Sequence, residues 1–294
     1  MSALWELAAP LGRKAFAMFT GPRFVEPVLS VLLLVALVEL LTQRRWRRYL
    51  TRTFLTDLTY MLFFATGTYY FLFSGHVERF IRGLVTERAP FLQLDLLGFL
   101  PVVPKAMAMI MAIDFFEYWM HRAGHASRLY WCFHCIHHSP RQLTPLTKFR
   151  IHWGDMLVFG TVKALPLLML GHPGVVWMPI LPLGILQVLS HFDIDLHYGP
   201  VLGRLLVSPR YHRVHHSADP AQCNTNFGII FSCWDYLFGT ANRDLTKPVA
   251  YGCPEMHVPD SFLQQFFYPF LLVARMAGRG EARPRPAHDA APVS

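Results

Sequence analysis

Runs of apolar residues, separated by short polar segments, divide the first part of the chain into predicted helices. The run over 25–41 is apolar apart from Glu26 and Glu39, and a helix of this length can cross a bilayer. A second run covers 55–73, and a third covers 101–120 after a proline-containing start. This pattern predicts three membrane-spanning helices.

The second half of the chain carries shorter apolar runs. Those over 156–170 and 175–190 are each short for a full crossing, so we expect a tight helical hairpin that enters and leaves the membrane on one side. The segment 74–95 is polar and predicts a connection, while 193–260 is mixed and is predicted to lie largely in the cytoplasm. An apolar run over 262–273 is too short to span and predicts a helix lying in the interface.

The composition indicates an integral membrane protein. The chain is 53% hydrophobic and only 16% charged, whereas a soluble domain carries about a quarter charged residues. We therefore predict an all-α fold, namely an integral membrane helical bundle with a cytoplasmic, histidine-rich helical cap. In this division 1–24 is an interfacial N-terminal segment, 25–277 is the membrane-embedded domain, and 278–294 is a disordered tail.

The net charge of +8 lies beside the apolar runs. An arginine-rich block over 44–48 follows the first run. Such blocks face the cytoplasm and attract anionic lipids, which explains the charge better than nucleic-acid binding does. Counting crossings from this block places 121–138 and 212–216 on the cytoplasmic side. The five cysteines form no paired framework and indicate a reducing compartment.

Histidines are the unusual feature of the polar segments. Fifteen occur in 294 residues, and eight of them fall into three short motifs: HRAGH at 121–125, HCIHH at 134–138 and HRVHH at 212–216. Residues three and four apart share one face of a helix, so each motif can direct two or three imidazoles to one place. Imidazole binds iron, zinc, copper and nickel, and one tetrahedral zinc takes at most four ligands. Eight histidines therefore predict two metal ions.

Two carboxylates precede the first motif within the third apolar run. Asp114 and Glu117 fall on one helical stripe with His121 and His125. Ionisable groups at membrane depth are costly and usually functional. We expect each carboxylate to accept the free ring N–H of a ligating histidine and so fix its tautomer. Direct ligation by Glu117, or a purely interfacial role, are the alternatives.

The motifs together resemble a known family. HRAGH, HCIHH and HRVHH, in this order among apolar spans, are similar to the histidine boxes of the fatty acid hydroxylase/sterol desaturase superfamily. The segment SPRYHRVHH at 208–216, followed by NTNFG at 224–228 and WDYLFGT at 234–240, resembles the C-terminal signature of that family. The resemblance covers about 108–240.

This resemblance implies a non-haem centre of two iron ions at the cytosolic edge of a helical membrane domain, where it activates O2. The implied ligands are the histidines of the three boxes and one further matching histidine: His121, His125, His134, His137, His138, His191, His212, His215 and His216. Asp193 stands where many members of the family have asparagine. The roles of Asp193, His152 and His197 stay open.

The activity implied by the resemblance is O2-dependent hydroxylation or desaturation of a lipid, and the sequence does not decide between these outcomes. Sterol, fatty acyl, ether lipid and carotenoid substrates all occur in the superfamily. Electrons are expected from a separate ferredoxin, cytochrome b5-like protein or reductase. The expected location is the bacterial inner membrane, or the endoplasmic reticulum of a eukaryote, with the active site facing the cytoplasm.

Two other classes of function use histidine clusters. A membrane zinc-dependent hydrolase is disfavoured because the chain has no HExxH motif and more histidines than zinc needs. A metal-binding or transport protein is disfavoured because the histidines gather at one edge of the predicted spans rather than along them. The identity of the bound metal distinguishes the three classes.

Overall fold

The computed structural model describes residues 33–35, 37–38, 41, 46–170, 177–246, 248, 250–253 and 256–278. All regular elements within these ranges are helical, which confirms the predicted all-α class; one isolated bridge joins Ser217 and Tyr251. The predicted interfacial segment 1–24, most of the first predicted span and the predicted tail beyond Gly278 lie outside the described residues.

The predicted second span over 55–73 is wrong in its boundaries. Helix α3 (Arg52–Ala65) ends within it, and Gly67 then takes a left-handed φ of 73°, which turns the chain into the short π-helical element η2 (Tyr70–Ser74). Much of the predicted polar connection forms helix α4 (Gly75–Arg88). Charged residues at helical spacing stabilise this segment, as the i,i+4 ion pair between Glu78 and Arg82 at 2.6 Å shows.

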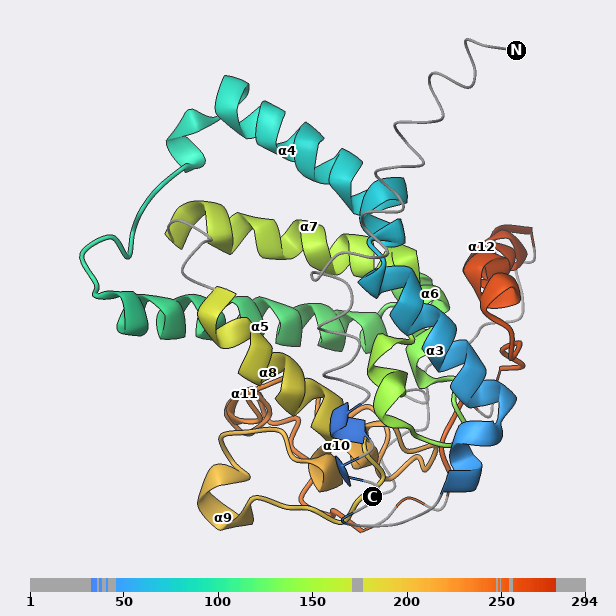
Figure 1. Cartoon of the computed structure of the whole chain (residues 1–294). Coiled ribbons are helices and arrows are strands. Elements are labelled where there is room, and N and C mark those ends of the chain that lie inside the picture. Colours follow the sequence, from blue (N-terminus) through green and yellow to red (C-terminus); the bar gives the residue numbers. More distant parts are fainter. Residues whose placement is uncertain are drawn as a thin grey trace.

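Helices α5 (Val102–Ala126) and α7 (Trp153–Leu170) run side by side through the middle of the molecule (Figure 1). Ser127 separates α5 from α6 (Arg128–His138), because its extended backbone ends the first helix and its hydroxyl accepts a bond from Tyr130 N at 3.3 Å to start the second. The chain therefore turns between the first two histidine motifs.

Helix α6 has two different faces. Its histidines lie on one face, while Cys132, Cys135 and Ile136 are buried on the other against Tyr60 and Leu272. These contacts pack α6 between α3 and α12 (Phe262–Gly278), which is longer than the predicted interfacial helix. Packing from behind thus fixes how the histidine face is oriented.

The remaining helices are short apart from α8, which packs against α10. They are η1 (Trp46–Leu50), η3 (Pro90–Leu92), η4 (Pro145–Phe149), α8 (Trp177–Ser190), α9 (Gly199–Leu202), α10 (Pro209–His215) and α11 (Cys233–Phe238). Among the described helices, none combines the length and the apolar composition needed to cross a bilayer. The membrane bundle with a cytoplasmic cap stays a prediction.

A buried ion pair joins α3 to the segment around η4. Arg150 Nε lies 2.5 Å from Asp57 Oδ1, and both side chains are almost completely inaccessible to solvent. Thr144 and Thr147 donate their hydroxyl hydrogens to Asp57 Oδ2 at 2.7 and 3.0 Å, and Arg150 Nη2 donates to the carbonyl of Thr53 at 2.6 Å. Because the charges are paired and hydrogen-bonded, this network holds the segment that follows the second histidine motif in place.

Candidate metal centre

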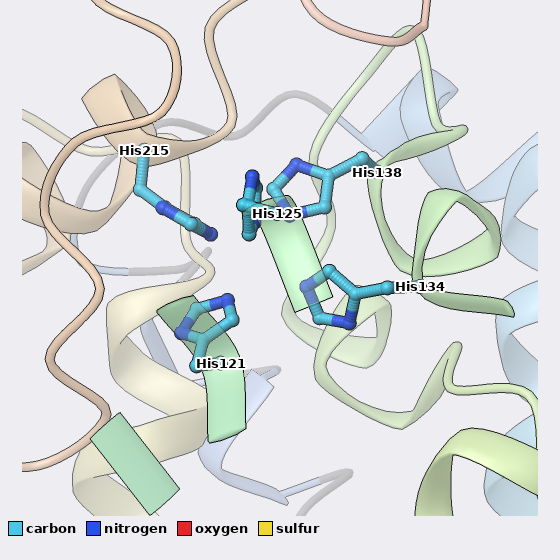
Figure 2. A group of neighbouring side chains, drawn as sticks. All are labelled: His121, His125, His134, His138 and His215. Carbon is cyan, nitrogen blue, oxygen red and sulfur yellow. The ribbon is translucent and has the colours of Figure 1, made fainter. Parts of the chain in front are cut away.

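Five buried histidines form a first group, which we call group A (Figure 2). They come from α5, α6 and α10, and one ring nitrogen of each lies within 4.8 Å of those of the others. The members of group A are His121, His125, His134, His138 and His215. Figure 2 shows the five rings converging on a shared centre.

Four further buried histidines form group B, again with one ring nitrogen each within 4.8 Å of the others. They are His137 from α6, His191 directly after α8, His212 from α10, and His216, which caps the C-terminus of α10. The two groups together contain all nine histidines that the sequence predicted as ligands. Helical spacing and a tertiary contact between α8 and α10 bring them together.

Pairs of consecutive histidines place the two groups side by side. His137 and His138 follow each other on α6, and His215 and His216 follow each other at the end of α10, yet the members of each pair belong to different groups. Neighbouring residues on a helix point about 100° apart, so each His-His pair sends one ring to each group. The rings of His138 and His216, one from each group, lie 4.5 Å apart between centroids.

The spacing within group B fits ligands of one metal ion. The Nε2 atoms of His191 and His212 are 3.0 Å apart, those of His212 and His216 are 3.1 Å apart, and those of His137 and His191 are 3.5 Å apart. Two nitrogens about 2.1 Å from one ion, at angles of about 90° to 109°, are separated by about 3.0 to 3.4 Å. These residues are therefore arranged as a ligand set.

Proton positions support the same conclusion. Nδ1 of His191 lies 2.8 Å from the carbonyl oxygen of Gln187, and Nδ1 of His137 lies 3.2 Å from that of Arg150. Carbonyl oxygens only accept, so Nδ1 carries the proton in both rings and both Nε2 atoms present a lone pair. Two lone pairs that face each other have no donor between them, and a bound cation satisfies both.

Group A shows the corresponding pattern. All five Nε2 atoms are buried and lack a hydrogen-bond partner among the described residues. On the other side of the rings, Nδ1 of His121 donates to the carbonyl of Phe227 at 2.7 Å and Nδ1 of His215 donates to that of Thr225 at 2.8 Å. Buried polar atoms are normally paired, so five unpaired nitrogens around one centre fit a metal ion.

Two side chains accept hydrogen bonds from the Nδ1 atoms of two further rings of group A. Asp155 Oδ2 accepts a hydrogen bond from Nδ1 of His134 at 2.9 Å, and this carboxylate is completely buried. Asn224 Oδ1 accepts from Nδ1 of His125 at 3.1 Å. A carboxylate increases the electron donation of the ring it holds more than a neutral carbonyl does, so His134 differs from the other members.

The segment 224–228 supplies three of these acceptors, namely the side-chain oxygen of Asn224 and the backbone carbonyls of Thr225 and Phe227. Asn224 and Asn226 adopt left-handed backbones with φ of 57° and 60°, which asparagine tolerates better than most residues. Asp235 accepts hydrogen bonds from the backbone N–H of Phe227 at 2.7 Å and of Gly228 at 2.8 Å. This carboxylate therefore fixes the loop whose carbonyl oxygens orient the rings.

Asp114 has other partners than the sequence predicted. Its oxygens accept from the backbone N–H of Ile230 at 2.9 Å, from that of Phe231 at 3.1 Å, and from the indole of Trp234 at 2.9 Å, rather than from a histidine. The carboxylate faces the chain that follows the 224–228 loop and anchors it to α5. Glu117 is buried one turn further along.

Burial keeps the imidazoles neutral. It lowers the pKa of His191 and of His215 to about 3. Burial and the neighbouring imidazoles also lower the pKa well below its usual range for His121, His125, His137, His138, His212 and His216. Neutral imidazole is the form that binds metal, so these rings are ready to act as ligands at neutral pH.

The three residues whose roles were left open lie outside both groups. His152 is buried, and its ring bonds to the carbonyl of Phe266 at 2.9 Å, which links it to α12. His197 accepts the backbone N–H of Gly199 at 3.1 Å. Asp193 accepts the hydroxyl hydrogen of Tyr251 at 3.2 Å.

Sequence reasoning missed most of the outer contacts. Asp155 carried a weak signal, as a carboxylate at the start of an apolar run, but no spacing relates it to His134. The loop acceptors had no side-chain signal, because Thr225 and Phe227 act through backbone carbonyls. The NTNFG and WDYLFGT segments carry only a family signature in the sequence, whereas in the structure they hold the acceptors that orient the rings.

Comparison with known proteins identifies the domain that carries these groups. The fatty acid hydroxylase family matches residues 106–240, a range that includes all nine histidines. No solved structure matches the chain.

Several curated proteins are similar to the chain. An ornithine lipid hydroxylase of Rhizobium tropici is 30% identical over 72% of this chain and 65% of its own length. An alkylglycerol monooxygenase of Caenorhabditis elegans is 31% identical over 47% of this chain and 27% of its own, and a very-long-chain aldehyde decarbonylase of Oryza sativa subsp. indica is 28% identical over 45% and 22%. The chain thus spans less than two thirds of the length of these relatives. On this domain match and these relatives, residues 106–240 of the chain form a domain of the fatty acid hydroxylase/sterol desaturase superfamily.

Proposed function

We propose that this protein is a membrane di-iron oxygenase that hydroxylates a lipid, using O2 and electrons from a separate donor. The observation that carries the proposal is the set of nine buried histidines, divided into two adjoining groups whose Nε2 atoms converge. Two redox-active metals side by side would share the electrons that O2 chemistry needs, and iron would supply the redox change that zinc lacks.

The donor set favours iron over zinc. Group A offers five imidazole nitrogens and group B offers four, whereas a catalytic zinc takes three protein ligands and a structural zinc takes four. A set of five suits a metal of higher coordination number. This difference supports the oxygenase over the zinc-dependent hydrolase.

The chain itself orients the ligands and keeps water away. The rings of Trp131 and Phe227 lie 5.0 and 5.2 Å from the ring of His125, so aromatic groups cover group A. Asp155 holds the Nδ1 proton of His134 and keeps that ring in one tautomer. A dry, apolar surrounding protects a strong oxidant from side reactions and suits a hydrocarbon chain as substrate.

Hydroxylation is the preferred outcome because the relatives named above include a lipid hydroxylase and an alkylglycerol monooxygenase. Their names point to lipids with a polar headgroup. We place the enzyme in a membrane, with its centre on the cytoplasmic side and a ferredoxin, cytochrome b5-like protein or reductase as electron donor.

Metal analysis of detergent-purified protein tests the proposal. We expect about two irons per chain, coupled as a pair in the Mössbauer spectrum, and incorporation of one atom of 18O2 into a lipid product when a reductant is supplied. His257→Ala removes an exposed histidine outside both groups and should leave iron and activity unchanged. Protein that binds zinc but no iron after reconstitution, and consumes no O2, would support the hydrolase instead.

A further inference from the structure

A cavity of about 410 Å³ lies outside the two histidine groups, beside α9 and α11. Its lining includes two guanidinium groups, an imidazole and a phenol ring, from Arg204, Arg243, His197 and Tyr236. Figure 1 shows α9 at the opposite side of the molecule from α4. None of these four side chains has a part in the proposed metal chemistry.

The two guanidinium groups are available to an anion. Among the described residues, no ion pair joins Arg204 or Arg243 to a carboxylate. Asp195, an acidic residue of the segment before α9, is already held by Arg210 at 2.5 Å and by Arg213 at 2.6 Å. Unpaired guanidinium groups that face one cavity are typical of phosphate or carboxylate recognition.

The cavity has one aromatic wall and a closely packed floor. The Arg204 guanidinium lies 6.0 Å from the centre of the Tyr236 ring, which holds the charge beside the cavity. On the floor, a Cβ added at Gly203 would come within 2.7 Å of Nε2 of His197, so the imidazole lies directly on the glycine backbone. Glycine at 203 is thus what allows the imidazole to line the cavity.

Exposed apolar side chains lie next to the lining residues in both segments. Val201 is 70% exposed and Leu202 is 53% exposed on α9, and Leu237, next to Tyr236 on α11, is 66% exposed. The two segments are joined where the N–H of Ser232 donates to the carbonyl of Leu205 at 3.1 Å. An anion-binding cavity with exposed apolar side chains beside it matches a molecule with a charged head and a hydrocarbon tail.

We propose that this cavity binds the phosphate group of an anionic phospholipid, with Arg204 and Arg243 as its charged partners and its acyl chains against the exposed leucine and valine side chains of α9 and α11. An acidic electron-donor protein is the competing occupant, but a concave site of this size fits a headgroup, and exposed leucine and valine side chains offer a protein carboxylate no partner. The site is independent of the metal assignment, because no histidine of group A or B lines it.

Calorimetric titration of the full chain in a non-ionic detergent tests the site. The probes are dihexanoyl phosphatidylglycerol below its critical micelle concentration, dihexanoyl phosphatidylcholine and inorganic phosphate. We expect the phosphatidylglycerol to bind more tightly than either other probe. Replacing both arginines, Arg204→Gln with Arg243→Gln, should weaken that binding at least about tenfold, because each lost charge-assisted contact contributes on this scale.

Arg52→Gln with Arg88→Gln, on α3 and α4, is the matched control, because it removes the same charge from exposed positions of other helices. This control should leave the affinity unchanged, and both double variants should melt at the temperature of the unmodified protein. Equal weakening in the control, no weakening in the cavity variant, or equally tight binding of inorganic phosphate would each overturn the proposal. It would also fail if the cavity variant bound lipid normally but lost affinity for an acidic ferredoxin used as probe.

Discussion

At the scale of single residues, the position of one ring proton decides what each histidine can do. A carbonyl or carboxylate on Nδ1 leaves the Nε2 lone pair for a metal, and the structure shows such an acceptor for six of the nine rings. His134 alone among them has a carboxylate, Asp155, as that acceptor. A metal bound in group A would therefore depend on a charge that a metal bound in group B would lack.

Asp155→Asn tests this dependence. The amide keeps the size of the side chain but loses the charge, so we expect iron affinity in group A to fall about 10- to 100-fold, as for other outer partners of metal ligands. Competition with a chelator, read by Mössbauer spectroscopy, would show one of the two irons leaving first. Asp260→Asn is the control, because Asp260 is an exposed carboxylate away from both groups. Equal chelator resistance in both variants would contradict the role of Asp155.

The two groups should respond differently to the loss of one ligand. His137→Ala leaves three donors in group B, whereas His215→Ala leaves four in group A. We expect His137→Ala to lose close to one iron per chain and His215→Ala to retain more, while activity falls more than about 100-fold in both, beyond the effect of an outer partner. Iron analysis of the two proteins, purified in parallel, gives the answer. Full activity in either variant would contradict its assignment as a ligand.

At the scale of elements, the rings of groups A and B are oriented by segments that buried polar networks hold in place. The Asp57–Arg150 pair fixes the chain after α6, and the carbonyl of Arg150 orients His137. Asp235 fixes the 224–228 loop in the same way for group A. Helices supply the histidines, and the connections between helices orient them.

Arg150→Gln tests the contribution of the buried pair. Removal of one partner leaves the Asp57 carboxylate uncompensated in the interior, so we expect a loss of about 3 to 5 kcal/mol in the free energy of unfolding. Arg150→Gln combined with Asp57→Asn removes both charges and should recover part of that loss. Denaturant unfolding of these two variants, of Asp57→Asn alone and of the parent measures all the losses. A loss in the double variant equal to the sum of the two single losses would show that the two side chains act independently.

How far the sequence predicts the site follows from how each contact is encoded. The spacing HxxxH and HxxHH places rings on one helix face, so the first and second motifs were predictable from the 3.6-residue period alone. The inclusion of His191 among the predicted ligands rests on the family resemblance. The helix period makes the two rings of each His-His pair diverge, but which rings meet in each group depends on how α6 and α10 lie relative to each other, which no local pattern encodes.

Other features were not predictable for different reasons. Asp114 lay on the predicted stripe with His121, yet its carboxylate faces backbone N–H groups of a loop more than a hundred residues later. Such backbone donors leave no trace in a side-chain pattern. Helix α4 was missed because its charged residues indicate a connection by composition, whereas their spacing along the helix stabilises it.

At the scale of the whole molecule, the fold gathers nine buried imidazoles, and burial lowers the pKa of eight of them. Segments from α5 to α10 contribute to one interior region, and without a metal that region opposes protonation. In the unfolded chain the same imidazoles titrate near their ordinary pKa of about 6.5. Folding of the metal-free protein is therefore linked to pH.

The sign of this linkage sets the last prediction. With the folded-state pKa of His191 and His215 lowered to about 3, the unfolded chain binds more protons than the folded one between pH 6.5 and 3. These two histidines should make the metal-free protein lose stability as pH falls through this window, by up to about 1.4 kcal/mol per pH unit for each histidine, and their contribution should be constant above it. Denaturant unfolding of chelator-treated protein from pH 8 to 5 measures the slope.

His191→Gln should reduce this slope, whereas His257→Ala, which removes an exposed ring, should not. A slope unchanged in His191→Gln would mean that this ring is protonated in the folded protein.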